Sequence, residues 1–137
     1  MISGINFDFK KMTKFGIIGC IGTIINIVSF ALGEKAFQIN YNLAALMAFG
    51  IAVTHNYIWN HLWTFKEENN NAPLNVRYYL YYIAGNIVGL CVNLVFLNVL
   101  IIMWGNRYSI LAQCCGVLSG VAFNYMFAKK IVFLKKV

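Results

Sequence analysis

The segment 15–33 reads FGIIGCIGTIINIVSFALG and contains no charged residue. A helix needs about 20 mostly apolar residues to cross a hydrocarbon core of about 30 Å. Three other segments meet this requirement, at 41–60, 78–103 and 108–128. The sole proline of the chain, Pro73, lies in the polar stretch between the second and third segments, which is typical of a loop. We therefore expect an all-α membrane protein with four transmembrane helices in one membrane domain.

The composition of the whole chain agrees with a membrane protein. Of its 137 residues, 61% are hydrophobic and 11% are charged, and the mean hydropathy is +0.68. Soluble domains contain about 25% charged residues. The formal net charge of +7 comes from residues outside the four apolar segments. We interpret this charge as a signal of orientation in the membrane and not of nucleic-acid binding.

Orientation follows from the lysines and arginines beside the helix ends, because cytoplasmic flanks are enriched in these residues. One set of flanks holds nine of them, whereas the opposite flanks hold Lys35 and Arg107. The nine are Lys10, Lys11, Lys14, Lys66, Arg77, Lys129, Lys130, Lys135 and Lys136. Both termini, the loop 61–77 and the basic tail 129–137 are therefore expected in the cytoplasm. The expected location is the cell membrane, with a multi-pass topology.

The first apolar segment also has features of a signal peptide, since basic residues precede it and the small residues Ala31 and Gly33 end it. Its apolar run is long for a signal peptide, however, and its removal would destroy the internal repeat described below. We therefore expect the segment to stay in the protein as the first transmembrane helix.

The apolar segments lack the residue types that several kinds of function require. No acidic residue lies inside them, which argues against a proton-coupled exporter of the small multidrug type and against a metal-dependent glycosyltransferase. The four cysteines lie inside the segments without a C-x-x-C pair. We expect no enzyme, no metal site, no disulfide and no cofactor.

A pattern of glycine and asparagine repeats along the chain. Shifting the second half by 67 residues places Gly89 on Gly22 and Asn93 on Asn26, so that G-x-x-x-N recurs in the first and third segments. Two helices per repeat would make both halves enter the membrane from the same side. The sequence therefore predicts two parallel two-helix repeats.

The ends of the second and fourth segments also repeat. VTHNYIWNHLWTF at 53–65 has a counterpart in VAFNYMFAKKIVF at 121–133. A shift of 68 residues places Asn124 and Tyr125 on Asn56 and Tyr57. Both copies lie at the expected cytoplasmic end of their helix, so we interpret them as symmetry-related elements.

Small and polar residues share one face of each expected helix at 3.6 residues per turn. In the first and third segments this face includes Gly16, Gly22, Asn26, Ser29, Gly85, Asn86, Gly89 and Asn93. Such a face lets helices pack closely while amides bond between them, which predicts a compact four-helix bundle. Polar side chains inside a membrane also mark transport pathways. Both roles stay open for Asn26, Asn93, Asn56 and Asn124.

Cations and aromatic rings accumulate at the expected cytoplasmic surface. Lys129, Lys130, Arg77 and His61, which the repeat pairs with Lys129, are candidates to hold a phosphate. Tyrosine and tryptophan rings nearby could stack on a sugar. The alternative is that the cations anchor the helices to anionic lipids and that the rings form an interfacial belt.

This ordered set of features resembles the GtrA-like family of small membrane proteins. The likeness covers about 14–133 and lies in FGIIGCIGTIINIVSF, VTHNYIWNHLWTF, YYIAGNIVGLCVNLVF and VAFNYMFAKKIVF. The family pattern is similar to N-[FY]-x-x-x-[RK]-x-[WF]-x-F. His61 replaces the cation of the first copy, which weakens a phosphate site there, and Ile131 replaces an aromatic residue of the second.

The resemblance implies a role in cell-surface polysaccharide synthesis or glycosylation. It implies that the protein is a flippase, which moves a polyprenyl-phosphate-linked monosaccharide across the membrane. Similar segments are fused to some dolichol-phosphate-mannose synthases, which implies an alternative role as a non-transporting accessory or anchor of a membrane glycosyltransferase. The expected partners are the lipid-linked sugar, membrane lipids and such an enzyme. A homodimer would enlarge a slender four-helix unit, although no residue pattern selects an oligomer.

Overall fold

The computed structural model describes the backbone of residues 9–134 and the side chains of residues 9–121. Within this range the chain is helical and contains no strand, which confirms the expected all-α class. The elements are α1 (Phe9–Ala31), η1 (Leu32–Ala36), α2 (Tyr41–Trp59), η2 (Asn60–Thr64), α3 (Val76–Trp104), η3 (Asn106–Tyr108) and α4 (Ser109–Leu134). The turns η1 and η2 are π-helical, and η3 is a 3₁₀ turn.

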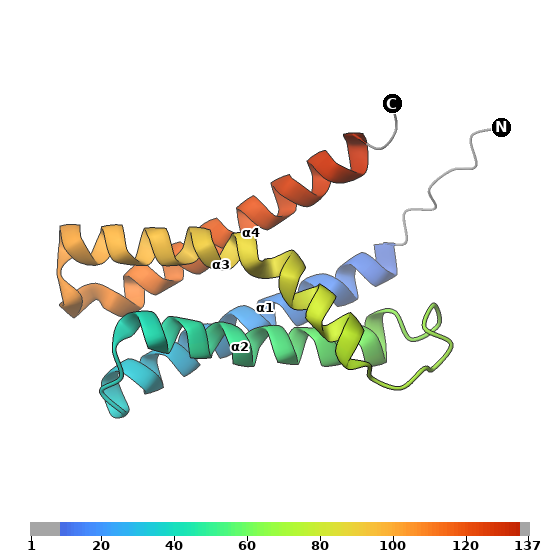
Figure 1. Ribbon diagram of the computed structural model, residues 1–137, viewed down its shortest axis with the longest axis horizontal. Helices are drawn as coiled ribbons and strands as arrows, with labels where there is room; N and C mark the ends of the chain where they lie inside the picture. The colour runs from blue at the N-terminus through green and yellow to red at the C-terminus, as the bar shows by residue number, and fades with distance from the viewer. Residues whose placement is uncertain (1–8, 135–137) are drawn as a thin grey trace.

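The four long helices form two hairpins that lie side by side (Figure 1). Helix α1 packs chiefly on α2, and α3 packs chiefly on α4. The start of α1, the loop between α2 and α3, and the end of α4 lie at one end of the molecule, which we call the near end. The turns η1 and η3 lie at the opposite end, the far end. Helices α1 and α3 therefore start at the same end, as equivalent helices of a parallel repeat would.

Local signals in the sequence set the helix boundaries. The Asn40 side chain caps α2 by accepting a hydrogen bond from the Asn42 backbone N–H at 2.9 Å. The Asn75 side chain caps α3 by accepting from the Arg77 backbone N–H at 2.8 Å. Helix α3 ends at Trp104 and is followed by Gly105, whose φ of 85° is accessible to glycine at little cost.

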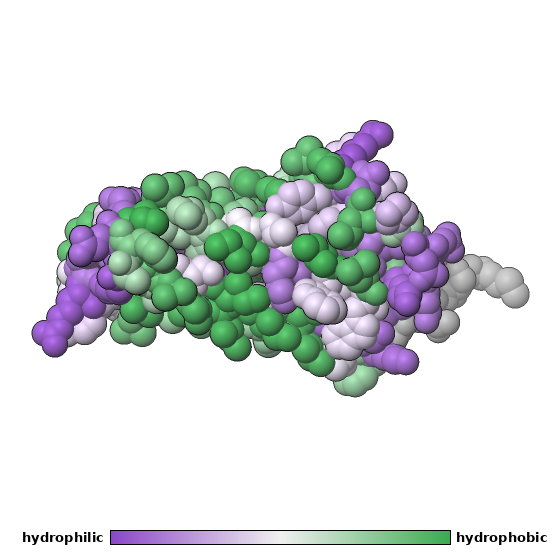
Figure 2. All heavy atoms as spheres, turned by 90° about the horizontal axis from the view of Figure 1, so that it is seen from below, coloured by the Kyte–Doolittle hydropathy of each residue, from purple (hydrophilic) through white to green (hydrophobic). Residues whose placement is uncertain are grey.

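Two stretches of the described residues have the length and hydropathy of a membrane span. They are Phe9–Ala36 and α3, each of which contains an 18-residue window apolar enough to cross a membrane. Only 22% of each window is buried, whereas the core helix of a soluble protein would be mostly buried. In α2 the polar residues Thr54, His55 and Asn56 lower the mean hydropathy. Figure 2 shows hydrophobic side chains over most of the middle of one face and hydrophilic side chains at its two ends.

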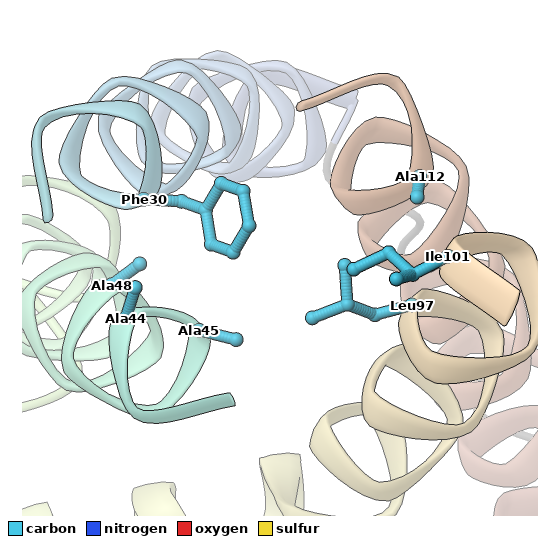
Figure 3. Packing of buried hydrophobic residues seen from close by; sticks show 7 residues of the cluster. All are labelled: Phe30, Ala44, Ala45, Ala48, Leu97, Ile101 and Ala112. Atoms are coloured by element: carbon cyan, nitrogen blue, oxygen red, sulfur yellow. The ribbon is translucent and has the colours of Figure 1, made fainter. Parts of the chain in front are cut away.

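All four helices contribute to one buried apolar cluster that joins the two hairpins. Phe30 of α1 faces small residues of α2, while Leu97 and Ile101 of α3 lie near Ala112 of α4 (Figure 3). The α2 residues are Ala44, Ala45 and Ala48. Small side chains let the helix backbones approach closely, so that dispersion contacts hold the hairpins together.

The predicted small-and-polar faces are correct in part. Gly22, Asn26, Gly89 and Asn93 are buried. Gly16 and Gly85 are exposed, and no neighbouring helix lies within 4 Å of either. The small-and-polar faces therefore do not pack along their whole length, since they are open at these two glycines.

Candidate functional site

The two G-x-x-x-N motifs meet in the middle of the bundle. Gly22, Asn26, Gly89 and Asn93 all line one central cavity of about 90 Å³, together with Asn56 and Asn86. Small-molecule sites have volumes of about 300 to 1,000 Å³. The central cavity is therefore large enough for a few water molecules but too small for a sugar.

The Asn56 side chain occupies the space that a Cβ atom on residue 22 would need. A Cβ atom on Gly22 would lie 2.2 Å from Asn56 Oδ1, which is far inside van der Waals contact. The Asn56 amide thus packs directly on the backbone of α1. The sequence placed both residues on inward faces but could not show that they touch.

Asn26 joins the two hairpins through a hydrogen bond. Its Oδ1 atom accepts from Gln113 Nε2 at 2.8 Å, and both side chains are buried. Asn93, its counterpart in the repeat, packs on Gly116 of α4 and its Oδ1 has no partner among the described residues. The amide of Asn26 therefore links helices, whereas the side-chain oxygen of Asn93 is buried against α4 without a hydrogen-bond partner among the described residues.

The Asn26–Gln113 bond gives a stability prediction. Asn26→Leu should lower the free energy of unfolding by about 1 to 3 kcal/mol, because it leaves a buried Gln113 donor without a partner. The double variant Asn26→Leu/Gln113→Leu should recover most of this loss, since neither polar group remains. Unfolding in mixed micelles measures both values. Additive losses in the double variant would show that the bond contributes nothing.

A second pocket, of about 700 Å³, opens at the near end between α2, α3 and the loop that joins them. Its size falls within the range of small-molecule sites. We call it the near-end pocket. Its lining residues are Tyr57, Asn60, His61, Phe65, Glu68, Asn69, Ala72, Pro73, Asn75, Tyr78, Tyr81 and Tyr82. Aromatic rings and amides thus dominate the wall, a combination that suits a hydroxyl-rich ligand with apolar ring faces.

Tyr57 organises the wall of the near-end pocket. Its hydroxyl donates to the Asn75 carbonyl at 2.8 Å and accepts from the Asn75 N–H at 3.2 Å. Its ring centroid lies 5.2 Å from that of Tyr79 and 5.8 Å from that of Tyr82. These contacts fasten the loop and the start of α3 to α2.

Tyr57→Phe should therefore destabilise the loop between α2 and α3 without leaving a cavity in the core. The change leaves the Asn75 N–H and carbonyl without their partner, and we expect a loss of about 1 to 2 kcal/mol in the free energy of unfolding. Faster hydrogen exchange in the loop should accompany it. Tyr81→Phe is the matched control, because the exposed Tyr81 hydroxyl accepts one bond from Arg77 Nε at 3.3 Å. Equal exchange rates in both variants would contradict this role of Tyr57.

Asn60 is a buried residue of the pocket wall that the sequence did not single out as a binding residue. Its Nδ2 donates to the Tyr82 hydroxyl at 3.3 Å, and its Oδ1 accepts from Thr64 Oγ1 at 3.0 Å. The π-helical turn η2 begins at Asn60. π-Turns are frequent at functional sites, but their wider register is not visible in the hydrophobic periodicity.

His61 lines the pocket with both ring nitrogens engaged. Nδ1 lies 3.2 Å from Asn69 Nδ2, which donates to it, so Nε2 carries the hydrogen that it donates to the Ala72 carbonyl at 2.8 Å. His61 thus holds the loop in place and is not free to bind a phosphate in this arrangement.

Of the predicted cations, Arg77 lies beside the pocket and does not belong to its wall. Arg77 is exposed on the first turn of α3, next to Tyr78, and lies over the Tyr81 ring at 5.8 Å. Glu68 is the carboxylate among the lining residues, and no described lysine or arginine belongs to the wall. Lys11 pairs with Glu68 and ties α1 to the loop. The side chains of Asn124, Tyr125, Lys129 and Lys130 lie outside the described residues.

Comparison with known proteins shows which family the chain belongs to. The chain is 26% identical over 121 residues to an uncharacterized membrane protein of Bacillus subtilis, YwcD, and the match covers 87% of this chain and 93% of that protein. It is 23% identical over 126 residues to a dolichol-phosphate mannosyltransferase of Pyrococcus furiosus, covering 92% of this chain and 34% of the relative. No solved structure matches. The model of the GtrA/DPMS transmembrane domain matches residues 14–133, and the chain therefore belongs to this family of membrane domains.

Proposed function

We propose that this protein is a flippase that binds the headgroup of a polyprenyl-phosphate-linked monosaccharide in the near-end pocket and moves it across the cell membrane. In this proposal all four long helices cross the membrane and the near end faces the cytoplasm. The polyprenyl tail stays in the lipid. The transported sugar would serve cell-surface polysaccharide synthesis or glycosylation.

The observation that carries the proposal is the near-end pocket itself. It has about 700 Å³ of space and a wall of tyrosines and amides, at the end where the basic flanks lie. Rings such as Tyr78 and Tyr81 can pack on a sugar, while amides such as Asn60 bond its hydroxyls. The family relationship adds support, because one relative is named for a lipid-phosphate sugar.

The phosphate would lie at the rim of the near-end pocket. Arg77 stands on the first turn of α3, where the positive end of the helix dipole also favours an anion. Arginine can bind two phosphate oxygens at once. Lys129 and Lys130 are proposed as further phosphate contacts from the end of α4. Asn69 and Ala72 already occupy both ring nitrogens of His61. His61 would therefore contact the headgroup as part of the pocket wall and would not bind the phosphate as a cation.

The sugar would cross along the seam between the hairpins. Asn26, Asn56 and Asn93 line the central cavity on this seam and could replace the water lost by the sugar hydroxyls. With its present volume of about 90 Å³ the cavity does not admit a monosaccharide, so the hairpins must move apart during transport. The repeat implies that Asn124 and Tyr125 would line the path opposite Asn56 and Tyr57. Transport would run downhill, driven by consumption of the sugar on the far side.

Ligand-dependent stabilisation tests binding. The full chain in nanodiscs is heated with a short-chain polyprenyl-phosphate mannose, with polyprenyl phosphate, or with free mannose. We expect stabilisation of about 2.7 kcal/mol when the lipid-linked sugar is at 100 times its Kd. The two partial ligands should stabilise less. Equal stabilisation by polyprenyl phosphate would mean that the sugar is not recognised, which would contradict the proposal.

An accessory role for a membrane glycosyltransferase is the second candidate. The chain matches about one third of the length of a dolichol-phosphate mannosyltransferase, so a related segment exists as part of a larger enzyme. The exposed loop between α2 and α3 would be the surface for such a partner. Co-purification with a membrane glycosyltransferase that Lys66→Glu disrupts, without loss of pocket binding, would favour this role over transport.

A further inference from the structure

A third pocket lies at the far end of the bundle, at the opposite end of α2 from the near-end pocket. Its volume is about 390 Å³, which is also within the range of small-molecule sites. We call it the far-end pocket. Its lining residues are Glu34, Lys35, Gln38, Ile39, Asn40, Tyr41 and Asn106. They come from η1, the α1–α2 connection, the start of α2 and η3, so that both hairpins contribute.

Glu34 is a buried carboxylate in the wall of this pocket. Its side chain is 6% exposed. Ser109 Oγ at the start of α4 donates to Oε2, and Lys35 Nζ lies 3.4 Å from the same oxygen. Oε1 has no hydrogen-bond partner among the described residues. A buried carboxylate is costly unless donors satisfy it, so the site has capacity for another donor.

The residues around Glu34 suit the hydroxyl groups of a sugar. Gln38, Asn40 and Asn106 supply amides, and Tyr41 supplies an aromatic ring. The cation Lys35 is already paired with Glu34, which leaves the wall without an excess of positive charge for an anion. The ligand class that fits is therefore an uncharged, hydroxyl-rich group that donates to a carboxylate and exchanges hydrogen bonds with amides.

We propose that the far-end pocket is a second sugar-binding site, which holds the headgroup of the lipid-linked monosaccharide after it has crossed the bundle. Glu34 is the main acceptor for the sugar hydroxyls, and a small shift of its side chain away from Ser109 opens the carboxylate to them. The inference rests on the proposed transport function and adds a release site to it. A protein that transported the sugar with the near-end pocket as its sole binding site would not need the far-end pocket.

The three tryptophans allow each pocket to be observed separately. Trp104 lies at the end of α3, two residues before Asn106 of the far-end pocket, whereas Trp59 and Trp63 lie at the near end. Trp59→Phe/Trp63→Phe leaves Trp104 as the far-end reporter. Trp59→Phe/Trp104→Phe leaves Trp63 as the near-end reporter. The full chain is used in detergent micelles, where both ends are accessible, and is titrated with short-chain polyprenyl-phosphate mannose.

We expect a saturable change in the emission of both reporters. Glu34→Gln should weaken the binding reported by Trp104 at least ten-fold and change the binding reported by Trp63 less than two-fold. Glu67→Gln, an exposed carboxylate outside both pockets, is the matched control and should change neither. Ser109→Ala removes the donor to Glu34 and should leave binding at Trp104 equal or tighter. If Glu34 only stabilised the fold, Glu34→Gln and Ser109→Ala would both lower the melting temperature and leave ligand binding unchanged.

The remaining outcomes separate the two proposals. A response of Trp63 without a response of Trp104 would overturn the far-end site and leave the near-end site intact. Silence of both reporters would overturn the proposed function as well. A response of Trp104 to phosphatidylglycerol but not to the mannose lipid would show that the pocket holds an ordinary lipid headgroup, which would also overturn the proposal.

Discussion

Replacing Gly116 with leucine is expected to separate α4 from α3 and to lower the free energy of unfolding by about 3 kcal/mol or more. A Cβ at this position would lie 2.2 Å from Asn93 Oδ1 and 2.8 Å from the Asn93 carbonyl oxygen. The second atom belongs to the backbone of α3, so a rotamer change cannot relieve the clash. The helices must move apart, and they lose the close packing that holds this hairpin together.

Gly85→Leu is the matched control for this prediction. Gly85 also lies within a long helix, but no atom of a neighbouring element lies within 4 Å of its Cβ position. We expect little change in stability there. Unfolding of both variants in mixed micelles, followed by circular dichroism, measures the difference. A Gly116→Leu protein as stable as Gly85→Leu would contradict the observed α3–α4 packing.

The double variant Tyr78→Ala/Tyr81→Ala is expected to weaken binding of a lipid-linked sugar by about ten-fold to one hundred-fold. Both rings line the near-end pocket and are mostly exposed, at 63% and 60%. Their removal therefore takes away ligand contacts without opening a hole in the core. An aromatic contact contributes about 0.5 to 1.5 kcal/mol beyond its buried area, so the loss of two rings accounts for this range.

Tyr108→Ala controls for the loss of an exposed tyrosine. Tyr108 is 49% exposed at the far end and lines neither of the two end pockets. Titration in micelles should give the same Kd for this variant as for the unmodified chain. If the Tyr78/Tyr81 variant also binds with an unchanged Kd, the near-end pocket is not the sugar site and the accessory role becomes the better account.

The sequence predicted those features that depend on local pattern. Helical periodicity placed Gly22 and Asn26 on the packed face of α1, and the repeat extended this prediction to Gly89 and Asn93. The sequence put Tyr57 near the end of a helix, and in the structure it lies in the last turn of α2 and lines the near-end pocket. Such features need only the 3.6-residue period of a helix and the comparison of two halves of the chain.

The features that the sequence did not predict depend on contacts between distant segments. The near-end pocket exists because the loop after η2 folds back so that Asn69 and Ala72 bond to His61. The π-turn at Asn60 shifts the helical register by one residue, which no periodicity reveals. Glu34 is buried, and its hydrogen-bond donor Ser109 lies 75 positions away in the sequence. None of these pairings has a local signature.

The near-end pocket, the central cavity and the far-end pocket follow one another along the bundle. Asn56 and Tyr57 are neighbours in the sequence, but Asn56 lines the central cavity and Tyr57 lines the near-end pocket. This segment therefore connects the proposed entry site with the seam along which the sugar would cross. The hydrogen bond from Gln113 of α4 to Asn26 of α1 crosses this seam and joins the two hairpins in this structure.

Transport by the purified protein alone tests the central claim most directly. The protein is reconstituted in liposomes with a fluorescent short-chain polyprenyl-phosphate mannose, and the fraction of lipid accessible to a membrane-impermeant reagent is followed over time. We expect rapid exposure of the inner-leaflet lipid, slowed at least ten-fold by Tyr78→Ala/Tyr81→Ala but not by Tyr108→Ala. Exposure no faster than in empty liposomes, with the protein folded, would contradict the transport account.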